Sequence, residues 1–172
     1  MIRRNYLDEN QCQVIIDEYE RSPVEITHEC CPHAFTGENV YSPNHVKRAT
    51  IGTSAFDLIH STIESMINEY HDYLDTYNAF HVDRRLTLLH PHLYRLMKYE
   101  KGAWIHPHTD HDHGVYGSCT INLNDDYEGG KFAFWGGQHQ ITLNKGDAMI
   151  WPADFFWAVS YTHLTLPTSH CV

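Results

Sequence analysis

The sequence lacks the features that mark a membrane protein or a nucleic-acid-binding protein. No apolar run approaches the roughly 18 residues that a membrane-spanning helix needs, and the first residues, MIRRNYLDENQ, lack the apolar core of a signal peptide. Lys and Arg number 12 against 22 Asp and Glu, so the formal net charge is −10, and the basic residues gather only in short pairs. We therefore expect neither nucleic acid nor a membrane as a partner.

Cysteine is scarce and irregularly spaced. The five cysteines are an odd number and do not have the spacing of a disulfide framework. Cys30 and Cys31 are adjacent, which does not suit two ligands of one zinc ion. This usage is typical of reduced thiols, so we expect a cytoplasmic protein.

Two helices are predicted in the N-terminal half of the chain. A length of 172 residues with 42% hydrophobic residues suits one compact domain with a core. Helical spacing predicts one helix over 7–19 that ends near Ser22, and a second that begins at Ser54, with Asp57 three residues on as in a capping box. Residues 24–53 show no strong period. The apolar stripe of the second helix, expected in the core, consists of Phe56, Ile59, Ile63, Met66, Ile67, Tyr70 and Leu74.

From residue 86 the apolar pattern changes to the alternation of strands. The expected strands are 86–89, 93–100, 104–109, 117–124, 131–135, 138–143 and 147–151. Turn signals separate them: the acidic segment NDDYEGG, the pair Gly136-Gly137, which suits a two-residue hairpin, and the segment NKGD. Helices followed by many short antiparallel strands predict a mostly β protein with N-terminal helices (α+β), of the sandwich or jelly-roll type.

The densest group of metal-ligating residues lies at 106–114, HPHTDHDHG, with four histidines and two aspartates. Alternate residues of a strand share one face, so His106, His108 and Asp110 point the same way if the strand extends that far. Two ligands at i and i+2 can hold one metal ion, with a third from elsewhere in the fold. Two histidines and one carboxylate leave the other positions of the ion open, which suits non-haem iron(II) oxygen chemistry.

A less specific interpretation of this cluster stays open at this point. Surface histidines beside aspartates are common and often bind nothing. A second His-x-Asp occurs at His81 and Asp83, before Arg84-Arg85, where we expect a solvated connection. A short His-x-Asp match is a weak indication by itself, so the surrounding segments must decide.

Several short motifs surround the cluster in a defined order. Tyr99 and Gly102 form a Tyr-x-x-Gly segment that leads into the His-x-Asp of His108 and Asp110, and SCTINLNDDYEGGKFAF and NKGDAMIWPADFFW follow. This order resembles the prolyl 4-hydroxylase-like branch of the iron(II)/2-oxoglutarate-dependent dioxygenases. In that family a strand ending in Leu-Asn, an acidic Gly-Gly turn and a Gly-Asp turn precede the second histidine. The resemblance covers about residues 93–157.

The resemblance implies a double-stranded β-helix that binds Fe(II) and 2-oxoglutarate. His108 and Asp110 would be catalytic residues and the first two iron ligands, while Tyr99 and Asn122 match positions that contact 2-oxoglutarate. Iron would activate O2, 2-oxoglutarate would be decarboxylated to succinate, and a peptidyl residue or small molecule would be hydroxylated; ascorbate is implied as a further cofactor. Tyr99 could instead pack in the core, Asn122 could satisfy backbone groups, and His106 could orient a ligand.

The resemblance ends near residue 157. The family needs a second histidine near position 159, followed within about ten residues by Arg or Lys, which pairs with the distal carboxylate of 2-oxoglutarate. This chain has Val159 there, and no Lys or Arg follows Lys145. A divergent protein could use His163 instead. We favour a foreign tail, because SYTHLTLPT resembles translated sequencing-adapter read-through.

We therefore expect a dioxygenase domain over 1–157, with helical support at 1–80 and a jelly-roll core at 86–157 that is incomplete at its C-terminus. Residues 158–172 would be a non-native tail, and the chain as given would be catalytically impaired. The alternative is a non-catalytic metal-binding jelly-roll protein, which the surplus of histidines favours. A zinc hydrolase ranks last, because the sequence contains no HExxH.

Overall fold

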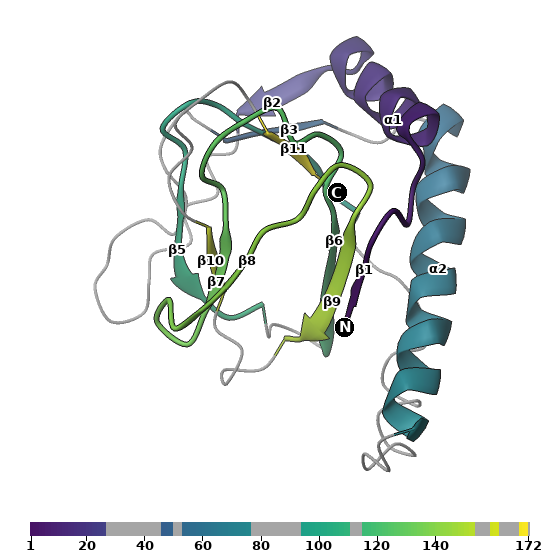
Figure 1. Ribbon diagram of the computed structural model, residues 1–172. Coiled ribbons are helices and arrows are strands. Elements are labelled where there is room, and N and C mark those ends of the chain that lie inside the picture. The colour runs from purple at the N-terminus through teal and green to yellow at the C-terminus, as the bar shows by residue number, and fades with distance from the viewer. Residues whose placement is uncertain are drawn as a thin grey trace.

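The structure of the protein is a computed structural model, in which two helices lie on one side of a set of antiparallel strands (Figure 1). It describes residues 1–26, 46–49, 53–76, 94–110, 115–153, 159–161 and 169–171. The backbone alone is described at 24–26, 46–49, 53–54, 159–161 and 169–171. Within these ranges, no helix combines the length and the apolar character needed to cross a membrane.

The first helix, α1, spans Glu9–Arg21 and is capped at both ends by local hydrogen bonds. The carboxylate of Asp8 accepts the backbone N–H of Gln11 at 2.8 Å, and the Gln11 side chain accepts the N–H of Asp8 at 2.9 Å. At the other end the N–H of Ser22 donates to carbonyls of the last turn. This capping box starts the helix two residues later than predicted, and it leaves Leu7 buried in the core just before the cap.

The second helix, α2, spans Thr53–Thr76, so Ser54 lies inside the helix rather than before it. The predicted stripe is confirmed at its main positions, since Ile59, Ile63, Met66, Tyr70 and Leu74 are buried together with Ala55. Phe56 is an exception: it is 40% exposed and stacks on His60 at 5.5 Å between ring centroids. The buried row follows Ala55 and Ile59, and Phe56 lies beside it on the helix surface.

The described residues form three antiparallel sheets. The first has the order β1-β9-β6 and consists of β1 (Ile2–Arg3), β9 (Ala148–Pro152) and β6 (Gly117–Ile121). The second has the order β5-β10-β7-β8 and consists of β5 (Ile105–His108), β10 (Val159–Tyr161), β7 (Phe132–Phe134) and β8 (His139–Ile141). The third has the order β11-β4-β3-β2 and consists of β11 (Ser169–Cys171), β4 (Leu96–Tyr99), β3 (Val46–Ala49) and β2 (Val24–Ile26).

The strand β9 separates two hydrophobic clusters. Figure 1 shows α2 beside β1, β9 and β6, with the β5-β10-β7-β8 sheet on the opposite side of these strands. Ala148 and Ile150 join the cluster under the helices, whereas Met149 and Trp151 join a cluster with Phe134 of β7. Successive side chains of a strand point to opposite faces, so β9 is buried on both faces.

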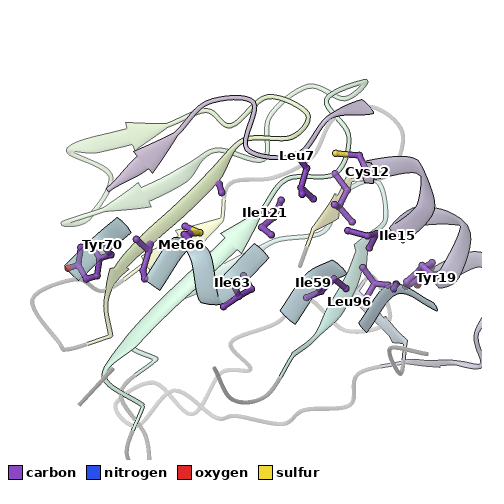
Figure 2. Close-up of a cluster of buried hydrophobic side chains, with 14 of the residues drawn as sticks. Leu7, Cys12, Ile15, Tyr19, Ile59, Ile63, Met66, Tyr70, Leu96 and Ile121 are labelled. Atoms are coloured by element: carbon purple, nitrogen blue, oxygen red, sulfur yellow. The ribbon is translucent and has the colours of Figure 1, made fainter. Parts of the chain in front are cut away.

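The cluster under the helices, here called the helix-side core, joins elements that are far apart in the sequence. Figure 2 shows Ile15 of α1, Ile63 of α2, Leu96 of β4 and Ile121 of β6 in this cluster. All four are at most 3% exposed. Full burial of such a side chain contributes roughly 1.5–3 kcal/mol, so the helix-side core supplies much of the hydrophobic stabilisation that holds α1 and α2 on the sheet.

The strands predicted between 93 and 151 are confirmed, with shorter or slightly shifted bounds. One turn was wrong: Phe134 pairs with His139, so the hairpin loop has four residues, 135–138, rather than two. Trp135 adopts a φ of +52° in this loop. The loop therefore includes residues on both sides of Gly136 and Gly137, the pair predicted to form the whole turn. The segment 24–53 also contains β2 and β3, which pair with each other although their sequences show no strand period. The predicted strand 86–89 lies outside the described residues.

Two strands fall in the segment predicted to be a foreign tail. β10 pairs with both β5 and β7, and β11 pairs with β4. These pairings place parts of residues 158–172 within the sheets, although the described residues do not form a complete jelly roll. The foreign origin of residues 158–172 stays a prediction.

Candidate metal centre

The two predicted iron ligands lie together at the end of β5. His108 is the last residue of that strand, and Asp110 follows two residues later. The distance between His108 Nε2 and Asp110 Oδ1 is 3.2 Å, and the two side chains are 19% and 28% exposed. The extended backbone at i and i+2 brings both side chains to one face, as predicted. Their role as metal ligands stays a prediction.

The backbone fixes the orientation of the His108 ring. Its Nδ1 lies 2.8 Å from the carbonyl oxygen of His106. Because a carbonyl oxygen only accepts, Nδ1 must carry the hydrogen, and Nε2 is the nitrogen turned toward Asp110. In metal-ligating histidines, a hydrogen bond from the ring nitrogen that does not bind the metal selects the tautomer in this way. The expectation that His106 orients a ligand through its ring is therefore modified, because its backbone carbonyl does so.

Three side chains act on Asp110: His108 of β5, Ser118 of β6, and Arg95, which directly precedes β4. Burial by itself raises the pKa of Asp110, but hydrogen bonds from His108 and Ser118, with the charges of His108 and Arg95, bring this pKa below its ordinary value. Burial likewise lowers the pKa of His108, but Asp110 and the His106 carbonyl outweigh this effect and raise it. Asp110 is therefore an ionised carboxylate at neutral pH, which is the form that binds a cation.

The pair fits two neighbouring ligands of one metal ion. Imidazole nitrogen and carboxylate oxygen each bind such ions at about 2.1 Å, so two ligands at a right angle lie about 3.0 Å apart. The observed 3.2 Å between His108 Nε2 and Asp110 Oδ1 is close to this value. Among the residues that the structure describes, no group of three His, Cys, Asp or Glu side chains comes together. The described residues thus bring together two side chains that could serve as ligands.

The position expected for the third ligand lies directly opposite His108. β10 pairs with β5 in a register that makes Val159 the partner of His108. The resemblance placed the second histidine near residue 159, and valine has no atom that can bind a metal. His163, the alternative third ligand, lies outside the described residues.

Tyr99 and Asn122 are both buried and are linked through Tyr127. Tyr99 of β4 is 4% exposed, and Tyr127 packs against the small cluster that Tyr99 forms with Ala103. The Tyr127 hydroxyl donates to Asn122 Oδ1 at 3.1 Å, while Asn122 Nδ2 donates to the carbonyls of Asn124 and Leu143 at 2.8 and 3.0 Å. These bonds fit the alternative that Asn122 satisfies backbone groups. Contact with 2-oxoglutarate stays a prediction for both residues.

The remaining candidates are placed only in part. The ring of His106 lies against Trp104, with 4.0 Å between centroids. The other histidines of the cluster, His111 and His113, and the second His-x-Asp at 81–83 lie outside the described residues. The sequence interpretation missed Ser118 and Arg95, which act on Asp110. Ser118 begins the SCTINLN motif, but no local signal shows that its hydroxyl meets a carboxylate from another sheet.

Comparison with known proteins identifies the fold. No family model and no curated protein matches the sequence, whereas many solved structures match the fold of the chain. One is a prolyl hydroxylase of Trichoplax adhaerens in complex with a peptide fragment of hypoxia inducible factor. It has a TM-score of 0.67 and 14% identity, with 99% of this chain and 80% of that chain covered.

Two further matches are of the same kind. A prolyl-4-hydroxylase of Pseudomonas putida has a TM-score of 0.64 and 13% identity, with 99% of this chain and 88% of that chain covered. A collagen prolyl hydroxylase of Paramecium bursaria Chlorella virus-1, in complex with 2-oxoglutarate, has a TM-score of 0.61 and 11% identity, with 99% and 90% covered. Similarity at this level of identity shows a shared fold.

Proposed function

We propose that this chain, which has the fold of the 2-oxoglutarate/Fe(II) oxygenases, derives from a dioxygenase that hydroxylates a peptidyl residue or a small molecule. Fe(II) would be bound by His108 and Asp110, with 2-oxoglutarate as cosubstrate and ascorbate as a further cofactor. One observation carries the proposal: an imidazole nitrogen and an ionised carboxylate oxygen lie 3.2 Å apart in a fold shared with prolyl hydroxylases.

The residues of the chain would prepare the site for the metal. The His106 carbonyl holds Nδ1–H of His108, so that Nε2 is presented to the ion. Hydrogen bonds and charge from Ser118 and Arg95 keep Asp110 ionised. Bound iron and 2-oxoglutarate supply the oxidative chemistry, while the protein contributes ligands, orientation and a site partly shielded from water.

Metal binding by the full chain tests this assignment. Isothermal titration with Co(II), or with Fe(II) under anaerobic conditions, should detect one site that His108→Ala and Asp110→Ala each abolish. His139→Ala is a matched control, because it removes an exposed histidine of β8. Equal metal binding by the wild type and His108→Ala would contradict the assignment.

We infer that the chain as given is catalytically impaired, because Val159 stands opposite His108. Val159→His should add the third ligand and raise metal affinity by about tenfold or more, roughly 1.4 kcal/mol. Ser160→His is the matched control, because successive strand positions face opposite ways. Equal affinity gains in the two variants would show that position 159 does not face the centre.

A non-catalytic metal-binding protein is the second candidate function. The described centre has two protein ligands rather than three, which favours it. Succinate formation from 2-oxoglutarate by Val159→His, with Fe(II) and ascorbate, separates the two candidates. If Val159→His binds metal but forms no succinate, whether or not a candidate substrate is added, the non-catalytic protein is favoured.

The foreign origin of the C-terminal segment belongs to the same proposal. No Lys or Arg follows Lys145, and the motif SYTHLTLPT begins where the family resemblance ends. The genomic reading frame past codon 157 tests it. A histidine codon near position 159, with Arg or Lys soon after, is the expected finding, and the present sequence in an independent genomic read would refute it.

A further inference from the structure

Trp151 carries a buried polar group that the described fold does not use. The side chain is 6% exposed, and its buried Nε1–H has no hydrogen-bond acceptor in the part of the chain that the structure describes. The N–H of a buried tryptophan usually finds a partner, and unpaired buried donors are rare and costly. An acceptor other than the described residues, such as a ligand or water, is therefore expected at this edge of the ring.

The position of Trp151 connects it to the candidate metal centre. The register of β9 with β6 pairs Trp151 with Ser118. Residues directly opposite in an antiparallel pair share one face, with their Cβ atoms about 4.5–5.5 Å apart. The hydroxyl of Ser118 in turn donates to Asp110. One residue, Ser118, therefore separates Trp151 from the predicted metal ligand Asp110, although the two are 41 positions apart in the sequence.

The body of the indole is held by neighbouring aromatic rings. Its centroid lies 6.0 Å from that of Phe132 and 5.9 Å from that of Phe134, and Met149 belongs to the same cluster. These contacts satisfy the apolar surface of the ring and fix its plane. The N–H is then the only part of the side chain without a partner in the described structure, and its direction is set by packing rather than by a hydrogen bond.

We propose that the Nε1–H of Trp151 donates a hydrogen bond to a carboxylate oxygen of the organic ligand at the His108–Asp110 centre. The proposal rests on the proposed function and adds a ligand-positioning residue to it. A charged acceptor is favoured because the guanidinium of Arg95 acts on the same carboxylate as Ser118. No Lys or Arg follows Lys145, so a side-chain donor for a ligand carboxylate in this last part of the chain must be an uncharged N–H or O–H, such as the indole N–H of Trp151.

The indole N–H signals in ¹H–¹⁵N NMR spectra report on this hydrogen bond directly. The full chain is labelled with ¹⁵N-tryptophan, and Trp151→Phe and Trp135→Phe identify two of its four indole signals. Zn(II) serves as a diamagnetic metal, and 2-oxoglutarate is the added ligand. The Trp151 signal should move downfield when 2-oxoglutarate is added to the zinc-loaded protein. The signal of Trp135, which is 45% exposed on the β7–β8 loop, should not move.

Affinity for 2-oxoglutarate provides the second measurement. Trp151→Phe keeps most of the ring and removes the donor, so affinity should fall by about ten- to a hundredfold, the range for a hydrogen bond to a charged group. Zn(II) affinity should be unchanged in Trp151→Phe. Trp135→Phe should match the wild type in its affinity for Zn(II) and in its affinity for 2-oxoglutarate. Equal 2-oxoglutarate affinity in the wild type and Trp151→Phe would overturn the inference.

The possible failures are distinguishable. If Zn(II) and 2-oxoglutarate bind but the Trp151 signal stays in place, the inference is wrong and the proposed function stands. If Zn(II) binds and 2-oxoglutarate does not, Trp151 has no ligand of the proposed class and the inference is also wrong. If Zn(II) binds equally to the wild type and His108→Ala, the proposed function itself fails and the inference falls with it.

Discussion

The two faces of the β1-β9-β6 sheet differ in chemistry although they belong to the same strands. On the face toward α2, Ile121, Ala148 and Ile150 are apolar and join the helix-side core. On the opposite face, Ser118 bonds to Asp110, and Trp151 brings a buried N–H. The period of two along a strand thus separates a face that stabilises the fold from a face that carries polar groups toward the candidate centre. Substitutions on the two faces should therefore affect different properties.

The largest effect is expected at the turn that leads into β9. Gly146 has a φ of +79°, and a Cβ there would collide with the backbone oxygen of Leu7. Gly146→Ala should lower the free energy of unfolding by about 4 kcal/mol, from backbone strain together with overpacking. Denaturant unfolding followed by circular dichroism measures this. Gly102→Ala is the matched control: its φ is +85°, but no atom lies within 4 Å of the added Cβ, so about 1 kcal/mol is expected.

The next effect separates the two faces of β9 itself. Ile150 is 3% exposed in the helix-side core, so Ile150→Ala should cost about 3 kcal/mol through lost burial and a cavity. Cobalt affinity of the folded protein should stay within about twofold, because Ile150 faces away from His108 and Asp110. Thermal unfolding and metal titration below the transition measure the two quantities. A tenfold loss of cobalt affinity in folded Ile150→Ala would show that the faces are not independent.

The smallest effect is expected from the polar face. Ser118→Ala removes one hydrogen bond to Asp110, and loss of a hydrogen bond that orients a metal ligand lowers metal affinity by about tenfold, or 1.4 kcal/mol. The free energy of unfolding of the metal-free protein should change by only about 1 kcal/mol. Thr120→Val is a matched control two residues along β6, on the same face. If Thr120→Val weakens cobalt binding as much as Ser118→Ala does, the loss of cobalt affinity in Ser118→Ala does not come from the bond to Asp110.

The predictions that were confirmed depend on residues within a single helix or strand. Both helices and the strands between 93 and 151 depend on spacing within one element, and such spacing can be followed along the chain. The pairing of β2 with β3 could not be predicted from the pattern, because β2 has only three residues and β3 does not alternate apolar and polar residues. The loop after Phe134 was predicted too short because Gly136 and Gly137 suited a two-residue turn, whereas the register places His139 opposite Phe134.

By itself the sequence determined the His108–Asp110 pair, because i and i+2 on an extended backbone share a face whatever the rest of the chain does. It also determined the two helices, the strands between 93 and 151 and the apolar row of α2. Only the tertiary structure decided that Ser118 bonds to Asp110, that Trp151 pairs with Ser118 and that Val159 stands opposite His108. These placements depend on the register between strands that are distant in the sequence. Register is set by packing of the whole sheet, and no local spacing encodes it.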